Sequence, residues 1–355
     1  MSNFPLSYKL SWLPRLLKPS LDGSPGPAPG WRETATPRLH ASVRLVFLGD
    51  LSAVANRTPP EFDQALREIF ASADLVVANC ESPIVESARF PFSTRLGLRH
   101  AMQPGFLDET LAAAGMLPDR LVLSLANNHA LDQGVAGLAE TLAVMAARGI
   151  RTVGTQHGGS LQRIGVGSLN LGFLAFTAWR NAREADFAGH VSMLSDLAGW
   201  QEEGSGLALV CAVPHWDWEF RHFPRSETRA LARQLVDSGV GLIAGHHAHV
   251  VQATETIGDV PVAYGLGDFL GTALPRQPWP GRVGAVFVAD ISAEAETAGK
   301  IIATFMLPFL RMRQRYNERL VPIGAIDDAM ATTVRRRLVA IFGEPAGGQA
   351  VPETL

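Results

Sequence analysis

The segment that decides the fold is "RLVLSLANNHALDQG", which runs from Arg120 to Gly134. Its first half is apolar and typical of a buried β-strand, whereas its second half is a cluster of amide and imidazole side chains. The segment that follows, "VAGLAETLAVMAARG", has the apolar spacing of a helix and ends at a glycine. A strand, a polar tip and a helix in this order predict one unit of a sheet with parallel strands.

The same order occurs twice upstream. "VRLVFLGD" (Val43 to Asp50) and "DLVVANCE" (Asp74 to Glu81) are apolar runs that end in polar residues, and a helical segment follows each of them. Further along, "VPVAYGLGDFL", "VGAVFVADIS" and "KIIATFMLPF" are β-rich runs with little helix between them, which indicates antiparallel hairpins. The sequence therefore predicts an α/β fold, one sandwich of mixed sheets with helices outside.

Composition excludes several classes of protein. Of the 355 residues, 47% are hydrophobic and 18% are charged, which is enough apolar material for a large core. The net charge of −3 lacks the basic excess that a nucleic-acid surface needs. Cys80 and Cys211 lie in apolar runs and are expected to be buried thiols. Neither a secretory signal nor a transmembrane anchor is apparent, so we expect a soluble, cytoplasmic protein.

Three parts of the chain differ in composition. Residues 1–42 are a Pro/Gly-rich extension, residues 43–345 are the expected folded domain, and residues 346–355 are a tail. Within the extension, "LSWLPRLL" has an apolar face that can dock on another surface. The basic run "RMRQRYNER" (Arg311 to Arg319) is expected to be a solvated face of a helix or loop.

Residues of the types that bind metal follow nearly every apolar run. They are Asp50, Glu81, Asn128 with His129, His215, His247 with His249, and Asp268. Each of them alone is more easily explained as a cap, a turn residue or an ordinary histidine. Together they are expected at one rim of the sheets, because ligands of open α/β sheets lie at the carboxyl ends of the strands. Carboxylate, imidazole and amide ligands suit Mn, Fe or Zn.

Longer motifs carry a resemblance to a known family. In chain order they are "GD", "NCESP", "SLANNHALDQGVAGLAETL", "HW" followed by "EF", "GHHAHVVQ" and "YGLGDF", from about Val43 to Leu274. This series resembles the CapA family of bacterial capsule or poly-γ-glutamate synthesis proteins, which are similar to calcineurin-like metallophosphoesterases. The resemblance implies a four-layer α/β/β/α sandwich, metallophosphoesterase-like, with a centre of two divalent metal ions in the loops between the sheets.

The resemblance also implies a role for each residue at a strand end. The implied metal ligands are Asp50, Glu81, Asn128, His215, His247 and His249. Glu81 stands at the position of the bridging carboxylate and Asn128 at that of the amide ligand. His215 and His247 would hold the second ion, and His249 the first. His129 would stabilise or protonate the leaving group.

The sequence departs from the family pattern at three positions. The metallophosphoesterase pattern has a histidine two residues after its first aspartate, and here that residue is Ser52, which weakens the implied first metal site. Asp217 stands where "HW" is usually followed by glycine. Asp268 replaces the asparagine of "LGNF" and is therefore a ligand, a catalytic base or a turn residue.

These assignments predict a metal-dependent hydrolase. Water activated by the metal would attack a phosphoester or a γ-glutamyl amide of a small anionic substrate, with His129 and Asp268 as catalytic residues. The expected substrate contacts are Arg95, Arg99, His100, Asn127 and His246. The alternative is a non-catalytic binding or scaffold subunit of poly-γ-glutamate or capsule synthesis.

Overall fold

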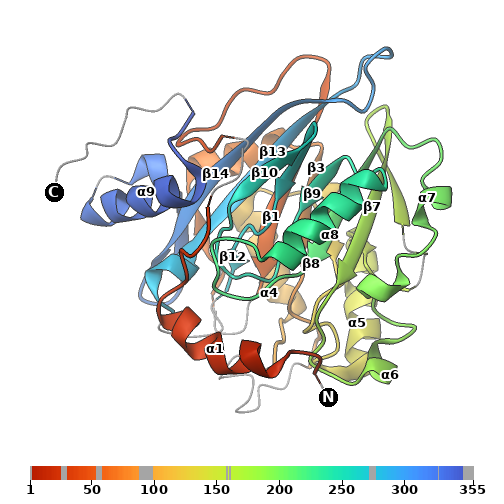
Figure 1. The fold of residues 1–355 in the computed structure, drawn as a ribbon, viewed down its shortest axis with the longest axis horizontal. Helices are drawn as coiled ribbons and strands as arrows, with labels where there is room; N and C mark the ends of the chain where they lie inside the picture. Colours follow the sequence, from red (N-terminus) through yellow and green to blue (C-terminus); the bar gives the residue numbers. More distant parts are fainter. Residues whose placement is uncertain are drawn as a thin grey trace.

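The structure is a computed structural model. It describes residues 2–24, 30–52, 58–87, 99–156, 159, 161–271, 277–326 and 328–346. Two mixed β-sheets pack face to face, and helices cover their outer faces (Figure 1). The predicted α/β sandwich of mixed sheets is therefore confirmed.

Among the described residues, the larger sheet has nine strands and combines parallel and antiparallel pairs. Its order is β2 (Glu61–Phe62), β15 (Glu318–Pro322), β14 (Ile301–Arg313), β13 (Val283–Ser292), β1 (Ser42–Leu51), β3 (Leu75–Asn79), β4 (Leu121–Ser124) and β5 (Arg151–Val153), with β12 (Asp268–Leu270) also paired to β1. The strands β1, β3, β4 and β5 are parallel, as the strand–helix alternation predicts. The strands β13, β14 and β15 form the antiparallel part.

In the part of the chain that the structure describes, the smaller sheet has six strands. Its order is β10 (Thr254–Ile257), β11 (Val260–Ala263), β9 (Leu242–Ala244), β8 (Leu209–His215), β7 (Leu169–Thr177) and β6 (Leu161–Val166). The four inner strands are parallel, and both edge strands pair antiparallel with their neighbours. The run "VPVAYGLGDFL", which was expected in a hairpin, divides between the two sheets, because β11 lies in the smaller sheet and β12 in the larger. Gly267, at φ +68°, lies in the turn between them.

Alternation along the strands explains the layers. In β1, Leu45 and Phe47 face the second sheet, whereas Val46 and Leu48 face the helices. Both faces of this strand are buried, which is why its sequence is almost continuously apolar.

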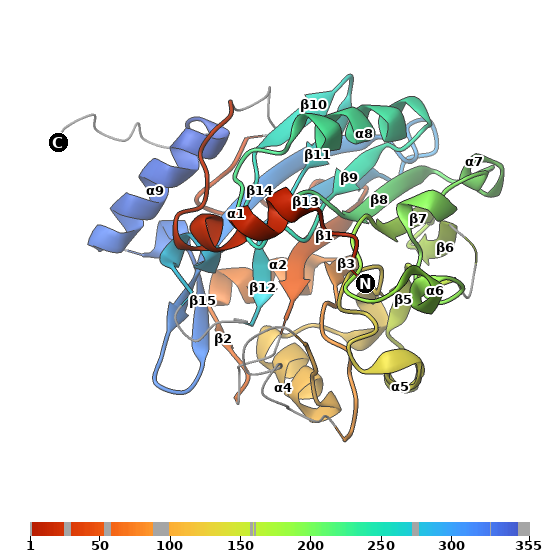
Figure 2. The same ribbon diagram turned by 60° about the horizontal axis from the view of Figure 1, so that its bottom comes forward.

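Helices lie on both outer faces (Figure 2). The larger sheet packs against α2 (Gln64–Ser72), α4 (Pro104–Ala114) and α5 (Gly134–Ala147), and the smaller sheet against α8 (Ser226–Asp237). The other helices within the described residues are α1 (Leu6–Leu17), α6 (Glu184–Phe187), α7 (Trp200–Glu203) and α9 (Ala329–Phe342), with 3₁₀ turns at Pro118–Arg120, Leu194–Asp196, Trp279–Arg282 and Ile323–Ala325. Among the described residues, no helix combines the length and the apolarity needed to cross a bilayer.

One surface prediction is wrong. Arg311, expected on a solvated face, is fully buried in β14. Its guanidinium lies within hydrogen-bonding distance of carboxylate oxygens of Asp268, at 3.1 Å, and Glu318, at 3.3 Å. The error arises because Asp268 comes from β12, 43 residues away, and a buried arginine is stable only with acidic partners; Glu318 comes from the paired strand β15.

Candidate metal centre

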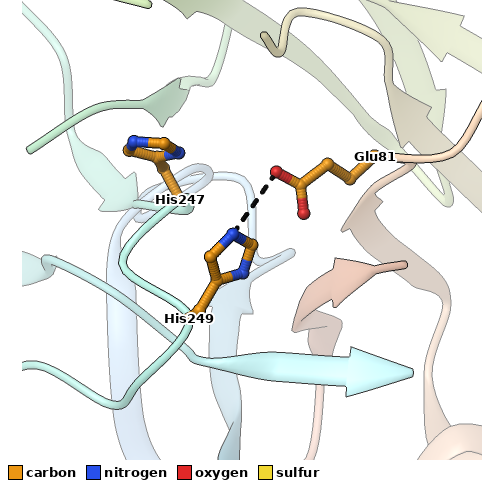
Figure 3. A group of neighbouring side chains, drawn as sticks. All are labelled: Glu81, His247 and His249. Carbon is orange, nitrogen blue, oxygen red and sulfur yellow. Dashed lines mark ion pairs between the residues drawn. The ribbon is translucent and has the colours of Figure 1, made fainter. Parts of the chain in front are cut away.

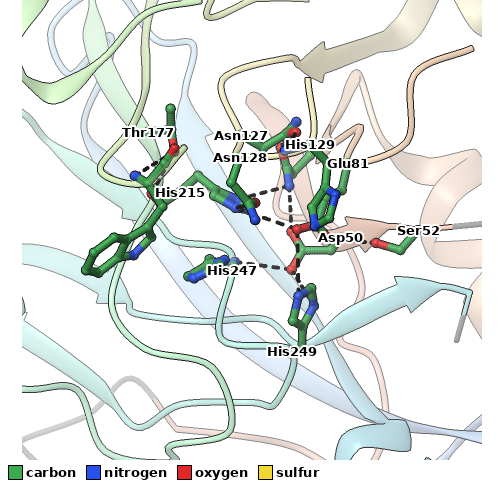
Figure 4. A network of polar contacts seen from close by, with 12 residues as sticks. Asp50, Ser52, Glu81, Asn127, Asn128, His129, Thr177, His215, His247 and His249 are labelled. Carbon is green, nitrogen blue, oxygen red and sulfur yellow. Dashed lines mark hydrogen bonds and ion pairs between the residues drawn. The ribbon is translucent and has the colours of Figure 1, made fainter. Parts of the chain in front are cut away.

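The strand ends predicted to share a rim do converge on one cluster (Figure 4). Asp50 lies in β1, and Glu81 follows the end of β3 by two residues. Asn128 and His129 follow β4, and His215 is the last residue of β8. The loop after β9 supplies the histidines His246, His247 and His249.

Two glycines allow the backbone to approach closely beside these residues. A Cβ atom on Gly49 would lie 1.8 Å from the carbonyl oxygen of Gly267. A Cβ atom on Gly245 would lie 2.2 Å from the carbonyl oxygen of Tyr264. The glycine before Asp50 and the glycine before His246 are therefore required by the packing of the strands that carry the cluster.

Backbone strain concentrates around the cluster. Among the described residues, the non-glycine residues with positive φ are Ala41, Asp217, Phe220, His247 and His249. His247 has φ 88° and His249 has φ 52°, and both are candidate ligands. Because this region of backbone conformation is unfavourable for side chains with a Cβ, the surrounding fold must hold the two histidines in place.

Glu81, His247 and His249 form the first group that fits a metal ion (Figure 3). Their ligand atoms all lie within 4.8 Å of one another. Glu81 Oε1 is 3.7 Å from His249 Nε2. No described residue makes a hydrogen bond to Glu81 Oε1 or to either ring nitrogen of His247, although both side chains are fully buried. Unpaired buried acceptors of this kind fit a bound cation.

Asp50, His249 and Asp268 form a second group within the same limit. His249 Nδ1 donates to Asp268 Oδ1 at 2.7 Å and lies 3.5 Å from Asp50 Oδ2. The other oxygen of Asp268 accepts hydrogen bonds from Arg311 at 3.1 Å and Gln277 at 3.4 Å. This group is therefore already hydrogen-bonded, and its charge is partly balanced by the buried guanidinium.

Amide side chains tie the carboxylates to the histidines. Asn79 Nδ2 donates to Asp50 Oδ1 at 2.7 Å and lies 3.2 Å from His215 Nδ1. His215 Nε2 donates to Asn128 Oδ1 at 2.7 Å and lies 3.6 Å from Glu81 Oε1. These bonds fix the orientation of the His215 ring, and its assignment as a ligand stays a prediction. Asn79 was not predicted as a site residue from the sequence, because an asparagine at the end of an apolar strand is typical of a turn.

Ser52 contacts the cluster through Glu81. Its hydroxyl donates to Glu81 Oε2 at 2.6 Å. Ser52 is thus buried and hydrogen-bonded to the carboxylate that was predicted to bridge two ions.

His129 lies at the edge of the cluster. Its Nδ1 donates to Asp132 Oδ2 at 2.6 Å, and its ring stacks on that of His100 with centroids 3.6 Å apart. Burial lowers the pKa of His129, but the charge and hydrogen bond of Asp132 outweigh burial and raise it. A protonated His129 is the form that can donate a proton, as the sequence predicts for it.

Burial shifts the pKa values of the ionisable side chains in the cluster. It raises the pKa of Asp50 and raises that of Glu81 to about 7, because a carboxylate loses its hydration there. It lowers the pKa of His215 and His247 well below the usual value. At His249 burial also acts downward, yet the charges of Glu81 and Asp268 raise its pKa well above that value.

The five predicted substrate contacts differ in burial and in their hydrogen-bond partners. Asn127 is buried and donates to Asn79 Oδ1 and to the carbonyl of Cys80. His246 Nε2 bonds the carbonyl of Leu48 at 2.9 Å, which ties the histidine loop to β1. His100 is buried against His129, whereas Arg99 is exposed. Arg95 lies outside the described residues, so all five assignments stay predictions.

An acidic residue beside the cluster was also missed. Glu219 Oε1 lies 4.0 Å from His247 Nε2 and accepts a hydrogen bond from Tyr8 at 2.7 Å. Trp12 donates to the other oxygen of Glu219, and the ring of Phe4 stacks on that of His247 with centroids 5.9 Å apart. The motif "HW" followed by "EF" marked this acid, but its contacts come from residues about 200 positions earlier.

Comparisons with known proteins place the chain in a family. A family model described as "Bacterial capsule synthesis protein PGA_cap" matches residues 44–273. The PGA biosynthesis protein CapA of Bacillus subtilis (strain 168) is 28% identical over 225 residues, which cover 58% of this chain and 56% of that protein. The capsule biosynthesis protein CapA of Bacillus anthracis is 32% identical over 163 residues, 42% of this chain and 39% of that protein. The match thus spans about half the length of these relatives, or less.

Two solved structures are similar at low sequence identity. A phosphatase from Mycoplasma pneumoniae is 15% identical, with a TM-score of 0.46, and the match covers 78% of this chain and 96% of that one. A putative 5'-nucleotidase from Staphylococcus aureus is 12% identical, with a TM-score of 0.43, and the match covers 83% and 58%. Because the family match spans more than half of the sequence, this chain belongs to the family of bacterial capsule synthesis proteins described as PGA_cap.

Proposed function

We propose that this chain is a metal-dependent hydrolase that acts on an anionic substrate in capsule-type biosynthesis. The observation that carries the proposal is the first ligand group. Glu81 Oε1 and both ring nitrogens of His247 are buried, and no described residue makes a hydrogen bond to them. Burying such atoms without partners costs free energy, so they are expected in a stable fold only when a ligand completes the site.

The chemistry of the donors suits one or two divalent ions of Mn, Fe or Zn. Glu81, His247 and His249 would hold one ion, and Asp50 and Asp268 with His249 are the candidate ligands of another. A bound ion would act as a Lewis acid toward an oxygen of the substrate and of water. The chain's own part is to fix these ligands on strained, buried backbone, so that little rearrangement is needed when an ion binds.

His129 is the proposed proton donor to the leaving group. Asp132 holds a proton on the ring and orients it through Nδ1, which leaves Nε2 as the second donor. Asn181 Nδ2 lies 3.4 Å from both ring nitrogens, at the edge of the ring. The bond cut is a phosphoester or a γ-glutamyl amide, both of which leave an atom that needs a proton.

A non-catalytic role in polymer synthesis is the second candidate. It is favoured by the names of the relatives, one of which is a probable polyglutamine synthesis accessory protein from Mycobacterium tuberculosis, 27% identical over 224 residues. In this role the cluster would bind a metal ion and an acidic substrate group without turnover.

Metal binding and turnover together test the proposal. The protein as purified is analysed for metal, titrated calorimetrically with Mn²⁺, and assayed with p-nitrophenyl phosphate and γ-glutamyl-p-nitroanilide. We expect wild type to bind metal and to cleave one of the two, and His247→Ala to lose metal affinity by at least about 100-fold, since loss of even an outer partner costs about 10–100-fold. His40→Ala, at an exposed histidine away from the cluster, is the matched control.

Three outcomes separate the candidates. Metal binding with turnover that disappears in His247→Ala supports the hydrolase. Metal binding without turnover of either compound supports the binding subunit. Absence of metal from wild type, with His247→Ala unchanged in every assay, contradicts both.

A further inference from the structure

We infer that α1 binds the surface of an anionic lipid bilayer through a row of exposed leucines. This leucine face consists of Leu6, Leu10, Leu13 and Leu17, with exposed fractions of 70%, 72%, 56% and 64%. Spacings of four, three and four residues place the four side chains on one side of a helix. A row of apolar side chains in water is unfavourable, so a helix that keeps one is expected to have something to bury it against.

The opposite face of α1 packs against the domain. Tyr8, Arg15 and Leu16 are buried against the domain. Tyr8 bonds Glu219, and Arg15 Nε donates to the carbonyl of Glu219 at 2.8 Å. The Arg15 guanidinium also lies 4.9 Å from the centre of the Trp218 ring. These contacts prevent α1 from turning its leucine face inward, and Figure 2 shows the helix lying across the outside of the molecule.

The start of the chain is fixed in the same way. Asn3 Nδ2 donates to the carbonyl of Ala178 at 2.8 Å, and its Oδ1 accepts from the backbone of Arg180 at 2.9 Å. The ring of Phe4 stacks between those of Tyr8 and Trp179, with centroids 4.6 and 4.9 Å away. The leucine face is therefore held in a defined orientation on the domain and is not part of a loose arm.

Charge favours a lipid surface as the occupant. Lys9 and Lys18 are exposed on α1 and at its C-terminal end, and residues 2–21 contain no Asp or Glu. A leucine row beside lysines is the pattern of helices that lie in the plane of a membrane, with the apolar side chains among the acyl chains and the cations at anionic headgroups.

A second copy of this chain is a poorer occupant. A 12-residue helix is about 18 Å long, and four leucines on it cover far less than the roughly 800 Å² per partner of a stable protein interface. Pairing two such helices would also bring four lysines together without an acid from either helix. A bilayer needs no matching surface, so the same four leucines suffice there.

Bilayer binding would place the metal centre beside the membrane. Phe4, next to the leucine face in sequence, stacks on His247, and Tyr8 bonds the acid that lies beside it. The helix that would touch lipid is thus the one that packs against the candidate ligands. This inference stands on the exposed face of α1 and does not depend on the proposed hydrolase activity.

Vesicle sedimentation tests the inference. The full chain is mixed with vesicles of phosphatidylcholine containing phosphatidylglycerol, or of phosphatidylcholine alone. We expect wild type to sediment with the anionic vesicles and to bind the neutral ones less. The double variant Leu10→Gln, Leu13→Gln is expected to bind at least about tenfold more weakly, because two apolar side chains are lost from the lipid contact. Lys9→Gln with Lys18→Gln is expected to weaken binding to anionic vesicles only.

The controls separate lipid binding from misfolding and self-association. Leu117→Gln with Ile302→Gln changes two leucine-sized side chains that are 53% and 43% exposed elsewhere, and it should bind like wild type. Circular dichroism must show that every variant is folded. The inference is overturned if wild type ignores anionic vesicles or if the leucine variant binds equally well. It is also overturned if wild type dimerises in solution through the leucine face, which light scattering detects. No arm of the test requires turnover, so its failure is distinct from failure of the proposed function.

Discussion

Glu81 and Asp268 are two buried carboxylates on either side of His249, and their surroundings are opposite. Glu81 Oε1 accepts no hydrogen bond from any described residue. Asp268 accepts from His249 through one oxygen and from Arg311 and Gln277 through the other. The difference shows that the cluster is not symmetric. One side keeps its acceptors open for a cation, whereas the other already has a cation from the chain itself.

The position of Arg311 explains the second half of this comparison. Its guanidinium is fully buried and contacts the carboxylates of Asp268 and Glu318 and the carbonyls of Gly271 and Gly281. The pairing of β13 with β14 brings it there from 43 residues along the chain. Such a charge is stable only as part of the set, because each partner compensates the lost hydration of the others.

The largest expected effect comes from removing the guanidinium of Arg311 on the Asp268 side of the cluster. Arg311→Met leaves Asp268 and Glu318 buried without their cation, and we expect unfolding in urea to show a loss of about 3–5 kcal/mol of stability. Arg313→Met, at the exposed end of the same strand, should cost almost nothing. Adding Asp268→Asn to Arg311→Met should recover part of the loss. Equal stability of Arg311→Met and wild type would contradict the assigned role of this ion pair.

On the Glu81 side of the cluster, the affinity for a metal ion should depend on pH. Burial raises the pKa of Glu81 to about 7, and nearby acids raise that of His249, so protons compete with a metal ion below neutrality. We expect Mn²⁺ affinity, measured by calorimetry from pH 8 to 5.5, to fall by at least about tenfold per pH unit below pH 7. Glu81→Gln should bind weakly and lose part of this slope. An affinity that does not change between pH 8 and 6 would show that neither group is a ligand.

The smallest effect is expected at Ser52, which contacts the carboxylate of Glu81. Its hydroxyl supports the charged form of Glu81, so Ser52→Ala should raise the pKa of Glu81 further. Since one hydrogen bond contributes about 1 kcal/mol, the affinity for Mn²⁺ at pH 7 should fall by less than about tenfold. Ser72→Ala, which removes a hydroxyl that bonds a helix carbonyl at 2.8 Å, is the control. A gain of affinity in Ser52→Ala would mean that the hydroxyl hinders the ion.

The parts of the site that follow from local pattern could be predicted. Asp50, Glu81, His247 and His249 end apolar runs, and the rule that parallel strands share a carboxyl edge is enough to bring them together. The βαβ order likewise predicted the parallel half of the larger sheet. These inferences needed only residue type and position along the chain.

The parts that depend on distant pairing could not be predicted. Nothing near Arg311 shows that it meets Asp268, and its basic neighbours are typical of a surface. Nor does composition show that a Pro/Gly-rich extension contains a helix whose Tyr8 reaches Glu219. Each of these contacts is decided by the tertiary fold.

The docking of α1 has a consequence for the order of assembly. Tyr8 and its partner Glu219 are 211 residues apart. At a synthesis rate of about 5–20 residues per second, the first helix is made roughly 10–40 s before the acid that it binds. Until then both its faces, the leucines and the aromatic rings, are exposed together. The helix made first therefore cannot take its place until Glu219 has been made, and only then does the candidate metal centre gain the aromatic neighbours that α1 supplies.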